Sequence, residues 1–571
     1  MKILSLLLII LTIPCILVSQ EIQESPKAKN YVSSEYDRNA VTFIGIDFNE
    51  NMSNAVLTKF AKTKVPDKFY DNSVPDKIIK PEVSRESTSV PLLGLDEKEI
   101  VKWLNQNKIG QEILSVWFNR QSDGTFNVDV LKERGLFNAN DNDFIVASAS
   151  KRGQSSLMDM GLGLVNQSYL VVFDFANILS MAQYYEKNET PAEKRIMNGY
   201  KSSVNSYLIK LDFSDSVAAV FFQDYWISEN DPNLDSKKAA FENANFPFVF
   251  LSKQHNEISA AQYNPGQPFA PKVQKSNDEL LEMMSQTAIE AALTDIENQN
   301  ADFRVKAMVS EVNPISAKIG KKEGLKFDQR YFVYENRERN NGTVYSRRIG
   351  VVKSMKVVDN RKVTTGQTEP SAFYQIAGGK VDNYGMFLEQ HNDVGLNIFL
   401  GSTFTGLTGY TGRVEYYISK AFNTFAGNGK SLEGLTSWKI YVEGGYDLKN
   451  DFTVNDFVDN FTFMRVSAGV GKDFYPLNFL HWGPFIGYGL ETISWETEEN
   501  VNISSEFIEA GVRLGFNLAH NIQLVGSATY YSLLTSEIKD TETNEKEDFE
   551  YKHYFKDRMK LGLNAGIRFM F

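Results

Sequence analysis

Charged residues recur on the polar side of several alternating segments in the last third of the sequence. They are Arg413, Glu415, Glu443, Arg465, Glu491, Glu509, Arg513, Lys560 and Arg568. The two signs are nearly balanced, so these side chains could pair with one another inside a narrow lumen, where unpaired charges would be costly. We predict a polar plug of ion pairs. A conducting path or a proton relay along the same residues remains the alternative.

The other residues able to carry chemistry form no catalytic or metal-binding pattern. The run from Asn138 to Asp143 lacks the glycine and the final acid of a calcium loop, and Gly161 and Gly163 lack the third glycine of a nucleotide loop. Cys15 is the only cysteine. None of the five histidines has the spacing of a metal-binding pair, and they are His255, His391, His481, His520 and His553. We therefore predict no enzyme activity, no metal and no cofactor.

The charged residues lie in a region with period-two alternation, which is typical of β-strands. The last segment shows it most clearly, because apolar residues at every odd position from Met559 to Phe571 alternate with Lys560, Gly562, Asn564, Gly566 and Arg568. Seven similar segments precede it, at about 393–405, 411–423, 437–450, 461–474, 482–497, 504–519 and 522–535. An even number of segments that long matches strands crossing a bilayer. We predict an eight-stranded antiparallel transmembrane β-barrel over residues 391–571.

The connections between these segments support the barrel in part. Short turns are expected near Pro476 to His481 and at Ala519 to Asn521, and a long acidic loop from Thr535 to Asp557 is expected to be solvated. Two connections do not fit this asymmetry, because the loop at 405–411 is short and the turn at 426–437 is long.

The chain ends in Ile567-Arg568-Phe569-Met570-Phe571. A terminal phenylalanine on an alternating strand resembles the sorting signal of small eight-stranded bacterial outer-membrane barrels of the OmpA type. The resemblance implies an outer-membrane location, contact with outer-membrane lipid, and reading of Phe571 by the barrel-insertion machinery.

The first twenty residues have the pattern of a secretory signal peptide, with Lys2 ahead of an apolar run. We therefore expect the rest of the chain to be exported and its N-terminal region to be periplasmic. The net charge of −12 argues against a nucleic-acid partner.

Two further units are predicted ahead of the barrel. Residues 21–302 mix strand patterns (144–147, 169–173, 217–222) with helix patterns (97–103, 156–164, and a helix after the Ser276 and Glu279 capping box), which indicates an α/β domain. This order resembles the periplasmic domain of curli-secretion-channel-like (CsgG-like) proteins. Residues 303–390 resemble a small SH3-like β module, with a spacer that has no site of its own as the alternative. The fold class is thus multidomain: an α/β domain, a small β module and a barrel.

The relative sizes of the barrel and of the region before it guide the functional hypothesis. A barrel of eight strands is just wide enough to be filled by side chains, while most of the chain precedes it. We expect a non-enzymatic outer-membrane anchor for a scaffold or assembly module that binds periplasmic envelope proteins. A pore for small solutes is the main alternative, and a barrel enzyme acting on lipid or peptide is a third.

Overall fold

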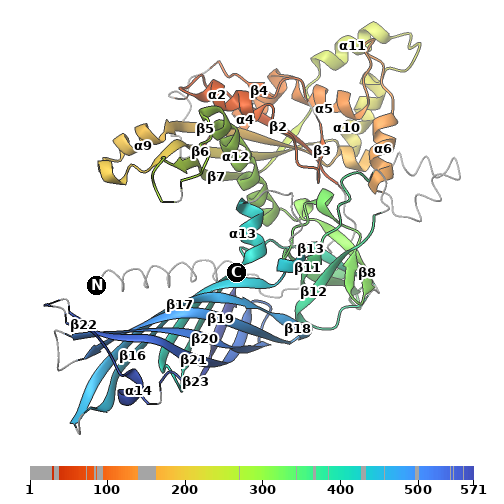
Figure 1. The fold of residues 1–571 in the computed structure, drawn as a ribbon. Coiled ribbons are helices and arrows are strands. Elements are labelled where there is room, and N and C mark those ends of the chain that lie inside the picture. The colour runs from red at the N-terminus through yellow and green to blue at the C-terminus, as the bar shows by residue number, and fades with distance from the viewer. Residues whose placement is uncertain are drawn as a thin grey trace.

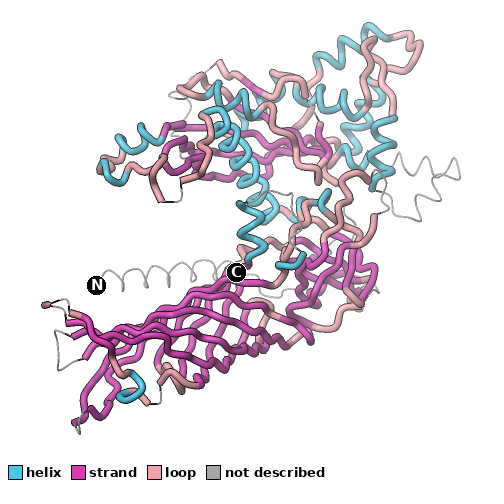
Figure 2. The backbone as a smooth tube through the Cα atoms, in the orientation of Figure 1, coloured by secondary structure: helices cyan, strands magenta, loops and turns pink. Residues whose placement is uncertain are grey.

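Three units follow one another along the chain, and the middle one lies between the other two (Figure 1). Helices are concentrated in the first unit, whereas the other two consist mainly of strands (Figure 2). The computed structural model describes residues 29–30, 38–72, 74–82, 85, 94–138, 162–268, 270–341, 344–363, 368–382, 385–425, 433–454, 457–495, 501–540, 542–543, 545–556 and 558–571. The predicted signal peptide, with Cys15, lies outside the described residues.

The first unit is built on a mixed sheet with the strand order β3-β2-β5-β6-β7. The strands are β2 (Ala40–Ile46), β3 (Tyr70–Asp71), β4 (Ile78–Ile79), β5 (Ser168–Ser180), β6 (Met197–Leu211) and β7 (Phe248–Tyr263). β2 runs parallel to β3, β4 and β5, whereas β5, β6 and β7 are antiparallel. All of β2 and most of β5 are buried, as expected for a sheet covered on both faces.

Helices form a layer on each face of this sheet. One hydrophobic core contains α2 (Ser53–Phe60) and α12 (Asn277–Gln299). The opposite core contains α4 (Glu97–Gln106), α5 (Ile109–Trp117), α6 (Asp129–Asn138), α10 (Asp215–Val220) and α11 (Leu234–Asn243). The short elements α9 (Met181–Lys187) and η1 (Ala192–Lys194) join β5 to β6. The first unit is therefore a three-layer α/β domain.

The α12 helix follows the sequence prediction closely. Ser276 accepts a hydrogen bond from the Glu279 amide, and the Glu279 carboxylate accepts one from the Ser276 amide at 2.7 Å, so the capping box is confirmed. The helix buries one apolar stripe, which consists of Leu281, Met284, Ala288 and Ala292. The predicted helix at 97–103 and strand at 169–173 are confirmed by α4 and β5.

The predicted strand from Val217 to Phe222 is wrong. This segment is the helix α10 followed by a π-helical turn, η2 (Phe221–Tyr225). Val217 and Phe221 are four residues apart and both contact the same core, where Phe221 stacks on Phe118 at 4.7 Å. A short apolar run fits a helix and a strand equally well, and here the aromatic core selects the helix. The predicted strand at 144–147 lies outside the described residues, and the predicted helix at 156–164 is described only from Leu162, where it is helical.

The second unit is a small closed β-barrel. Its strands are β8 (Lys306–Val312), β9 (Ile315–Ala317), β10 (Arg330–Glu338), β11 (Val344–Lys356), β12 (Ser371–Gly378) and β13 (Met386–Gln390), with the 3₁₀ turns η3 (Ala301–Phe303) and η4 (Lys321–Glu323). They pair in the order β11-β10-β13-β8-β9-β12, and β12 pairs back to β11. β1 (Lys29–Asn30) adds to β11. We call this unit the β module, and its SH3-like character stays a prediction.

The third unit is a closed barrel of eight antiparallel strands, as predicted. They are β14 (Leu396–Thr403), β15 (Gly409–Tyr417), β16 (Trp438–Val454), β17 (Phe457–Lys472), β19 (Leu480–Trp495), β20 (Val501–Asn517), β21 (Ile522–Asp540) and β23 (Leu561–Met570). Pairing of β14 with β23 and of β17 with β19 closes the ring. The short β18 (Phe474–Leu477) pairs with the start of β19. Because successive strands run in opposite directions, α13, the β18–β19 turn and the β20–β21 turn lie at the same end of the barrel. We call this the module end and the opposite one the far end.

The alternation of the barrel strands places apolar side chains on the outside. Ile486, Leu514 and Leu561 are 50–55% exposed, while polar residues between them are buried. A water-soluble barrel would have its apolar side chains inside. Alternation alone allows both a water-soluble and a membrane barrel, and the structure has the arrangement of a membrane barrel. In the described part of the chain, no helix has both the length and the apolar character needed to cross a membrane.

Two barrel connections differ from the predictions. The second strand ends at Tyr417 rather than 423, because Ser419 and Lys420 belong to a helix, α13 (Ile418–Phe425). This helix contacts Asp328 of the β module and Asp393, which lies just before β14; η5 (Glu433–Leu435) follows it. The loop after β21 is solvated only in its first part, which includes β22 (Lys546–Asp548). Its second part, with α14 (Tyr551–Tyr554), turns into the far end of the barrel.

Candidate functional site

Buried ion pairs fill the module end of the barrel interior. Arg568 is fully buried, and its guanidinium contacts Glu415 at 3.1 Å, Asp473 at 3.2 Å and the His481 imidazole at 2.9 Å. Lys439 binds both Asp473 and Glu415. Each carboxylate therefore meets more than one cation, which is the arrangement that makes buried charges tolerable.

The pairing continues through the middle of the barrel. Arg413 bridges Glu415 at 2.8 Å and Glu443 at 2.9 Å. The Arg513 guanidinium lies 3.9 Å from the ring centre of Phe485 and 3.7 Å from Glu415. These side chains come from β15 and β16 on one side of the ring and from β19 and β20 on the opposite side, and all of them point into the interior.

Two more of the predicted residues bind neutral partners instead of opposite charges. Glu509 accepts hydrogen bonds from the Tyr441 hydroxyl at 2.7 Å and the Ser467 hydroxyl at 2.9 Å. Arg465 donates to Thr403, Thr408 and Thr411 at 2.9–3.1 Å. Part of the interior is thus held by hydrogen bonds rather than by ion pairs.

The far end of the barrel is closed by the loop after β21. Arg558 pairs with Glu491 at 2.6 Å, and the Tyr551 hydroxyl donates to the same carboxylate at 2.6 Å. Phe555 packs edge-on against Phe461 and Phe463 at 5.1–5.3 Å. Arg558 also pairs with Asp447 at 3.2 Å, so an aromatic cluster and the ion pairs of Arg558 close this end.

Eight of the nine predicted interior charges lie buried inside the barrel. Lys560 is the correction: it precedes β23, and its side chain is exposed. The predicted strand began at Met559, but that residue has a positive φ of 39° and the strand starts two residues later. The alternation near a strand end therefore did not fix which side Lys560 faces.

Several interior residues were not singled out from the sequence: Lys439, Asp473, His481, Gln523 and Arg558. Lys439, Asp473 and Gln523 lie on predicted strands and His481 directly precedes one, so the inward alternation could have found these four. Arg558 had no such signal, because it belongs to a loop that only the tertiary structure brings back to Glu491.

Glycines make room for the largest interior groups. A Cβ atom at Gly515 would lie 1.7 Å from the His481 ring, and one at Gly445 would lie 2.4 Å from the Arg465 guanidinium. Both contacts are far shorter than van der Waals distance. The interior is therefore packed with side chains rather than open.

Two buried aspartates join the barrel to the β module. Asp328 of the module accepts hydrogen bonds from the Ser437 amide at 3.0 Å, the Tyr374 hydroxyl at 2.6 Å and the Ser419 hydroxyl. Burial raises the pKa of Tyr374 well above its usual value, and the nearby Asp328 carboxylate raises it further. The module residue Tyr374 therefore stays a neutral donor.

The second aspartate lies just before β14. Asp393 binds Lys353 of β11 at 2.7 Å and also binds Lys420 of α13. Burial alone would raise the pKa of Asp393, but the two ammonium groups outweigh it and hold that pKa well below its usual range. Burial lowers the pKa of Lys420 to about 8, with Asp393 partly offsetting this.

The α/β domain is tied to the same junction. The Glu297 carboxylate at the end of α12 accepts hydrogen bonds from Gln390 and Asn392, each at 2.8 Å, and pairs with Lys68. Asn392 immediately precedes Asp393. A continuous set of polar contacts therefore connects all three units.

A separate row of polar side chains crosses the α/β sheet. Asp174 is fully buried and pairs with Arg85, Asn205 bonds to the His255 Nδ1 at 2.9 Å, and the His255 Nε2 lies 3.3 Å from Glu257. Of the five histidines, none of which has metal-pair spacing in the sequence, His255 thus joins a polar row that strand pairing assembles. In the described ranges no three or more His, Cys, Asp or Glu residues are grouped as a metal site would require.

Glu112 in α5 predicts how the stability of the α/β domain depends on pH. Burial, with Asp76 as a second cause, raises the pKa of Glu112 to about 7. The unfolded carboxyl ionises near pH 4.5 while the folded one does not, so stability falls as pH rises between these values and the loss is complete above pH 7. Because the side chain is only half-buried, solvent screening reduces this loss to about 1–2 kcal/mol.

The neutral variant Glu112→Gln is expected to stabilise the α/β domain above pH 7 by that amount and to match the wild type near pH 4. Amide hydrogen exchange of residues 97–138 in the full chain at several pH values measures this. A gain that does not depend on pH would contradict the explanation.

Together, the apolar exterior and the filled interior define a membrane-spanning type of eight-stranded β-barrel.

No protein-family model matches the sequence, and no curated protein does. Similar solved structures include a major outer membrane protein from Thermus thermophilus, 16% identical, with a TM-score of 0.22, covering 31% of this chain and 98% of that one. The N-terminal β-barrel domain of Pseudomonas aeruginosa OprF is 12% identical, with a TM-score of 0.17, covering 31% and 96%. Neisserial surface protein A is 13% identical, with a TM-score of 0.20, covering 31% and 94%.

Proposed function

We propose that this protein is an outer-membrane anchor that carries a periplasmic α/β domain for binding other envelope proteins. The observation that carries the proposal is the barrel itself, which exposes apolar side chains outward and fills its interior with ion pairs and aromatic rings. Such a barrel has the surface to reside in a membrane but no space for transport.

The junction supports the anchoring role. Asp328 and Asp393 bind groups on both sides of it, and Glu297 extends the contacts to the α/β domain. With the module end facing the periplasm, the exposed acidic segment around β22 would face the cell exterior. In the proposed orientation both N-terminal units would lie in the periplasm, as expected for a chain exported by its predicted signal peptide.

The β7 strand is the best candidate surface for a partner. It forms one edge of the α/β sheet, and among the described residues no strand pairs with its outer side. Val249 and Leu251 on it are 41–44% exposed. Proteins usually protect long edge strands, because an open edge invites another chain to add a strand.

Charged substitutions on the β7 edge strand test whether it binds a partner. In the full chain, Val249→Lys combined with Leu251→Lys is expected to lower co-purification of envelope proteins about fivefold, which corresponds to about 1 kcal/mol. Val273→Lys is the matched control, because Val273 is 81% exposed in a loop outside the strand. Equal recovery with both variants would reject the β7 edge, and recovery of no envelope protein by the wild type would reject the scaffold function.

A pore is the competing function, and conductance measurements separate the two. The purified full chain in a planar bilayer is expected to show no steady openings, because Arg568 and Glu415 block one end and Arg558 and Phe555 the other. Steady, ion-selective openings would contradict the anchor and favour the pore.

A further inference from the structure

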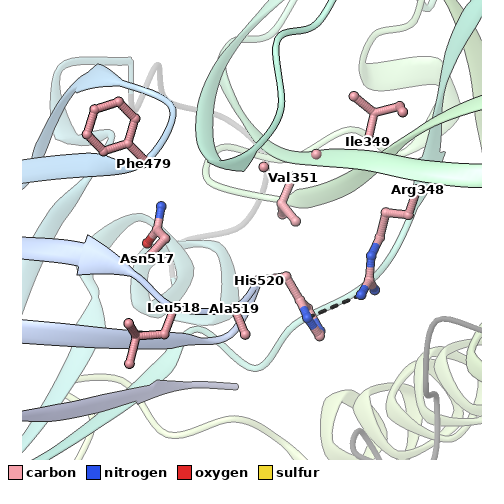
Figure 3. Close-up of a pocket in the computed structure, with 10 residues that line it drawn as sticks. Arg348, Ile349, Val351, Phe479, Asn517, Leu518, Ala519 and His520 are labelled. Atoms are coloured by element: carbon pink, nitrogen blue, oxygen red, sulfur yellow. Dashed lines mark hydrogen bonds between the residues drawn. The ribbon is translucent and has the colours of Figure 1, made fainter.

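A cavity of about 300 Å³ lies where the β module meets the module end of the barrel. Its lining comes from β11 and Gly378 of the module and from two barrel turns, and it includes Arg348, Phe479, Leu518 and His520. Figure 3 shows Arg348 and His520 side by side, with Phe479 and Leu518 on the barrel side. The volume equals that of roughly ten water molecules, which is enough for a phosphate with a small polar group.

The cavity holds a cation, Arg348, to which the described residues supply no carboxylate partner. The Arg348 Nη2 atom lies 3.3 Å from the His520 Nδ1 atom, and the guanidinium lies 4.7 Å from the ring centre of Phe332. Within the described ranges, no Asp or Glu forms an ion pair with Arg348. A half-buried guanidinium is well suited to bind two oxygens of a phosphate at once.

The same opening is bordered by exposed apolar side chains. Phe479 is 51% exposed and Leu518 is 64% exposed. They continue the apolar exterior of the barrel, where Leu477 and Phe516 are each 48% exposed. The cavity therefore lies at the boundary between the lipid-facing surface and the polar module.

We propose that this cavity binds the phosphate headgroup of a membrane phospholipid in the leaflet next to the β module. Arg348 binds the phosphate oxygens, His520 borders the headgroup, and Phe479 and Leu518 contact the acyl chains. The inference rests on the proposed membrane location of the barrel. Inorganic phosphate shares the headgroup chemistry but lacks the chains, so the two sources can be separated.

The test titrates the full chain, in micelles of a phosphate-free detergent, with dihexanoylphosphatidylglycerol, inorganic phosphate and dihexanoylglycerol, and follows binding by calorimetry. Arg348→Gln is expected to weaken binding of the lipid and of phosphate about tenfold, the loss of a charge-assisted hydrogen bond. Arg347→Gln is the matched control, because Arg347 is the exposed neighbour on the same strand and does not line the cavity. Leu518→Ser is expected to weaken lipid binding about threefold and to leave phosphate binding unchanged.

Each outcome decides the proposal. The proposal is supported if Arg348→Gln weakens binding of lipid and phosphate, Leu518→Ser weakens only lipid binding, and dihexanoylglycerol does not bind. Equal effects of Arg348→Gln and Arg347→Gln, or no binding of the phospholipid, overturn it. Phosphate binding as tight as that of the lipid, with no effect of Leu518→Ser, also overturns it, since the site would then serve a free anion. Flotation of the chain with lipid vesicles is measured separately, so that failure of the membrane anchor is distinguished from failure of the site.

Discussion

Replacing Glu415 by alanine is expected to lower the free energy of unfolding of the barrel by about 3–5 kcal/mol, the usual cost of breaking a buried ion pair. Glu415 is 1% exposed and lies within 3.7 Å of cationic groups on four residues, Arg413, Lys439, Arg513 and Arg568. Without the carboxylate, these buried cations would repel one another. Urea unfolding in micelles, followed by the heat-modifiable shift of the barrel on a gel, measures the change.

Two further variants make this result interpretable. Glu415→Gln keeps the size of the side chain and removes its charge, so it should reproduce most of the loss if charge is the cause. Glu537→Ala is the surface control, because Glu537 pairs with Lys546 where both side chains are 42–60% exposed, and it should change stability by less than about 0.5 kcal/mol. A loss for Glu415→Gln no larger than that of Glu537→Ala would show that the interior charges are not coupled.

Replacing Asp393 by alanine is expected to destabilise the junction between the β module and the barrel by about 3–5 kcal/mol. The change would leave Lys353 and Lys420 buried, 4% and 14% exposed, without their shared carboxylate. Hydrogen exchange in β11 and α13 of the full chain should rise, and limited proteolysis should cut near residues 391–395.

The pH dependence of this effect follows from the depressed pKa of Asp393. Its stabilisation is fully present above the ordinary aspartate value of about 4 and is lost as pH falls toward the lower folded value. The difference between wild type and Asp393→Ala should therefore be constant from pH 5 to 7 and shrink below pH 4.

Controls for the junction come from the same module. Asp359→Ala removes a solvent-exposed pair with Arg361 and should leave exchange at the junction unchanged. Adding Lys353→Met to Asp393→Ala should recover part of the loss, because an apolar side chain replaces one uncompensated charge. If adding Lys353→Met recovers no stability, charge pairing does not explain the destabilisation caused by Asp393→Ala.

Local pattern was enough to predict the barrel strands, the helices α4 and α12 and the strand β5. The alternation from Leu561 to Phe571 and its seven earlier copies gave the strand number, and the capping box at Ser276 gave the start of α12. These features depend on residues close together in the sequence. For the same reason, the short run from Val217 to Phe222 was misassigned, since only distant aromatic residues such as Phe118 decide its structure.

The sequence by itself determined that apolar and charged residues alternate along eight long segments, and hence that Arg413, Glu415 and Arg568 would share one face. The tertiary structure decided that this face points inward and that Arg568 meets Glu415 across 153 positions of sequence. It also placed Arg558 inside the barrel and Lys560 outside it. Alternation is set by the local backbone geometry of a strand, whereas ion pairing, loop closure and the junction at Asp393 depend on contacts between distant segments, which form only when the barrel closes.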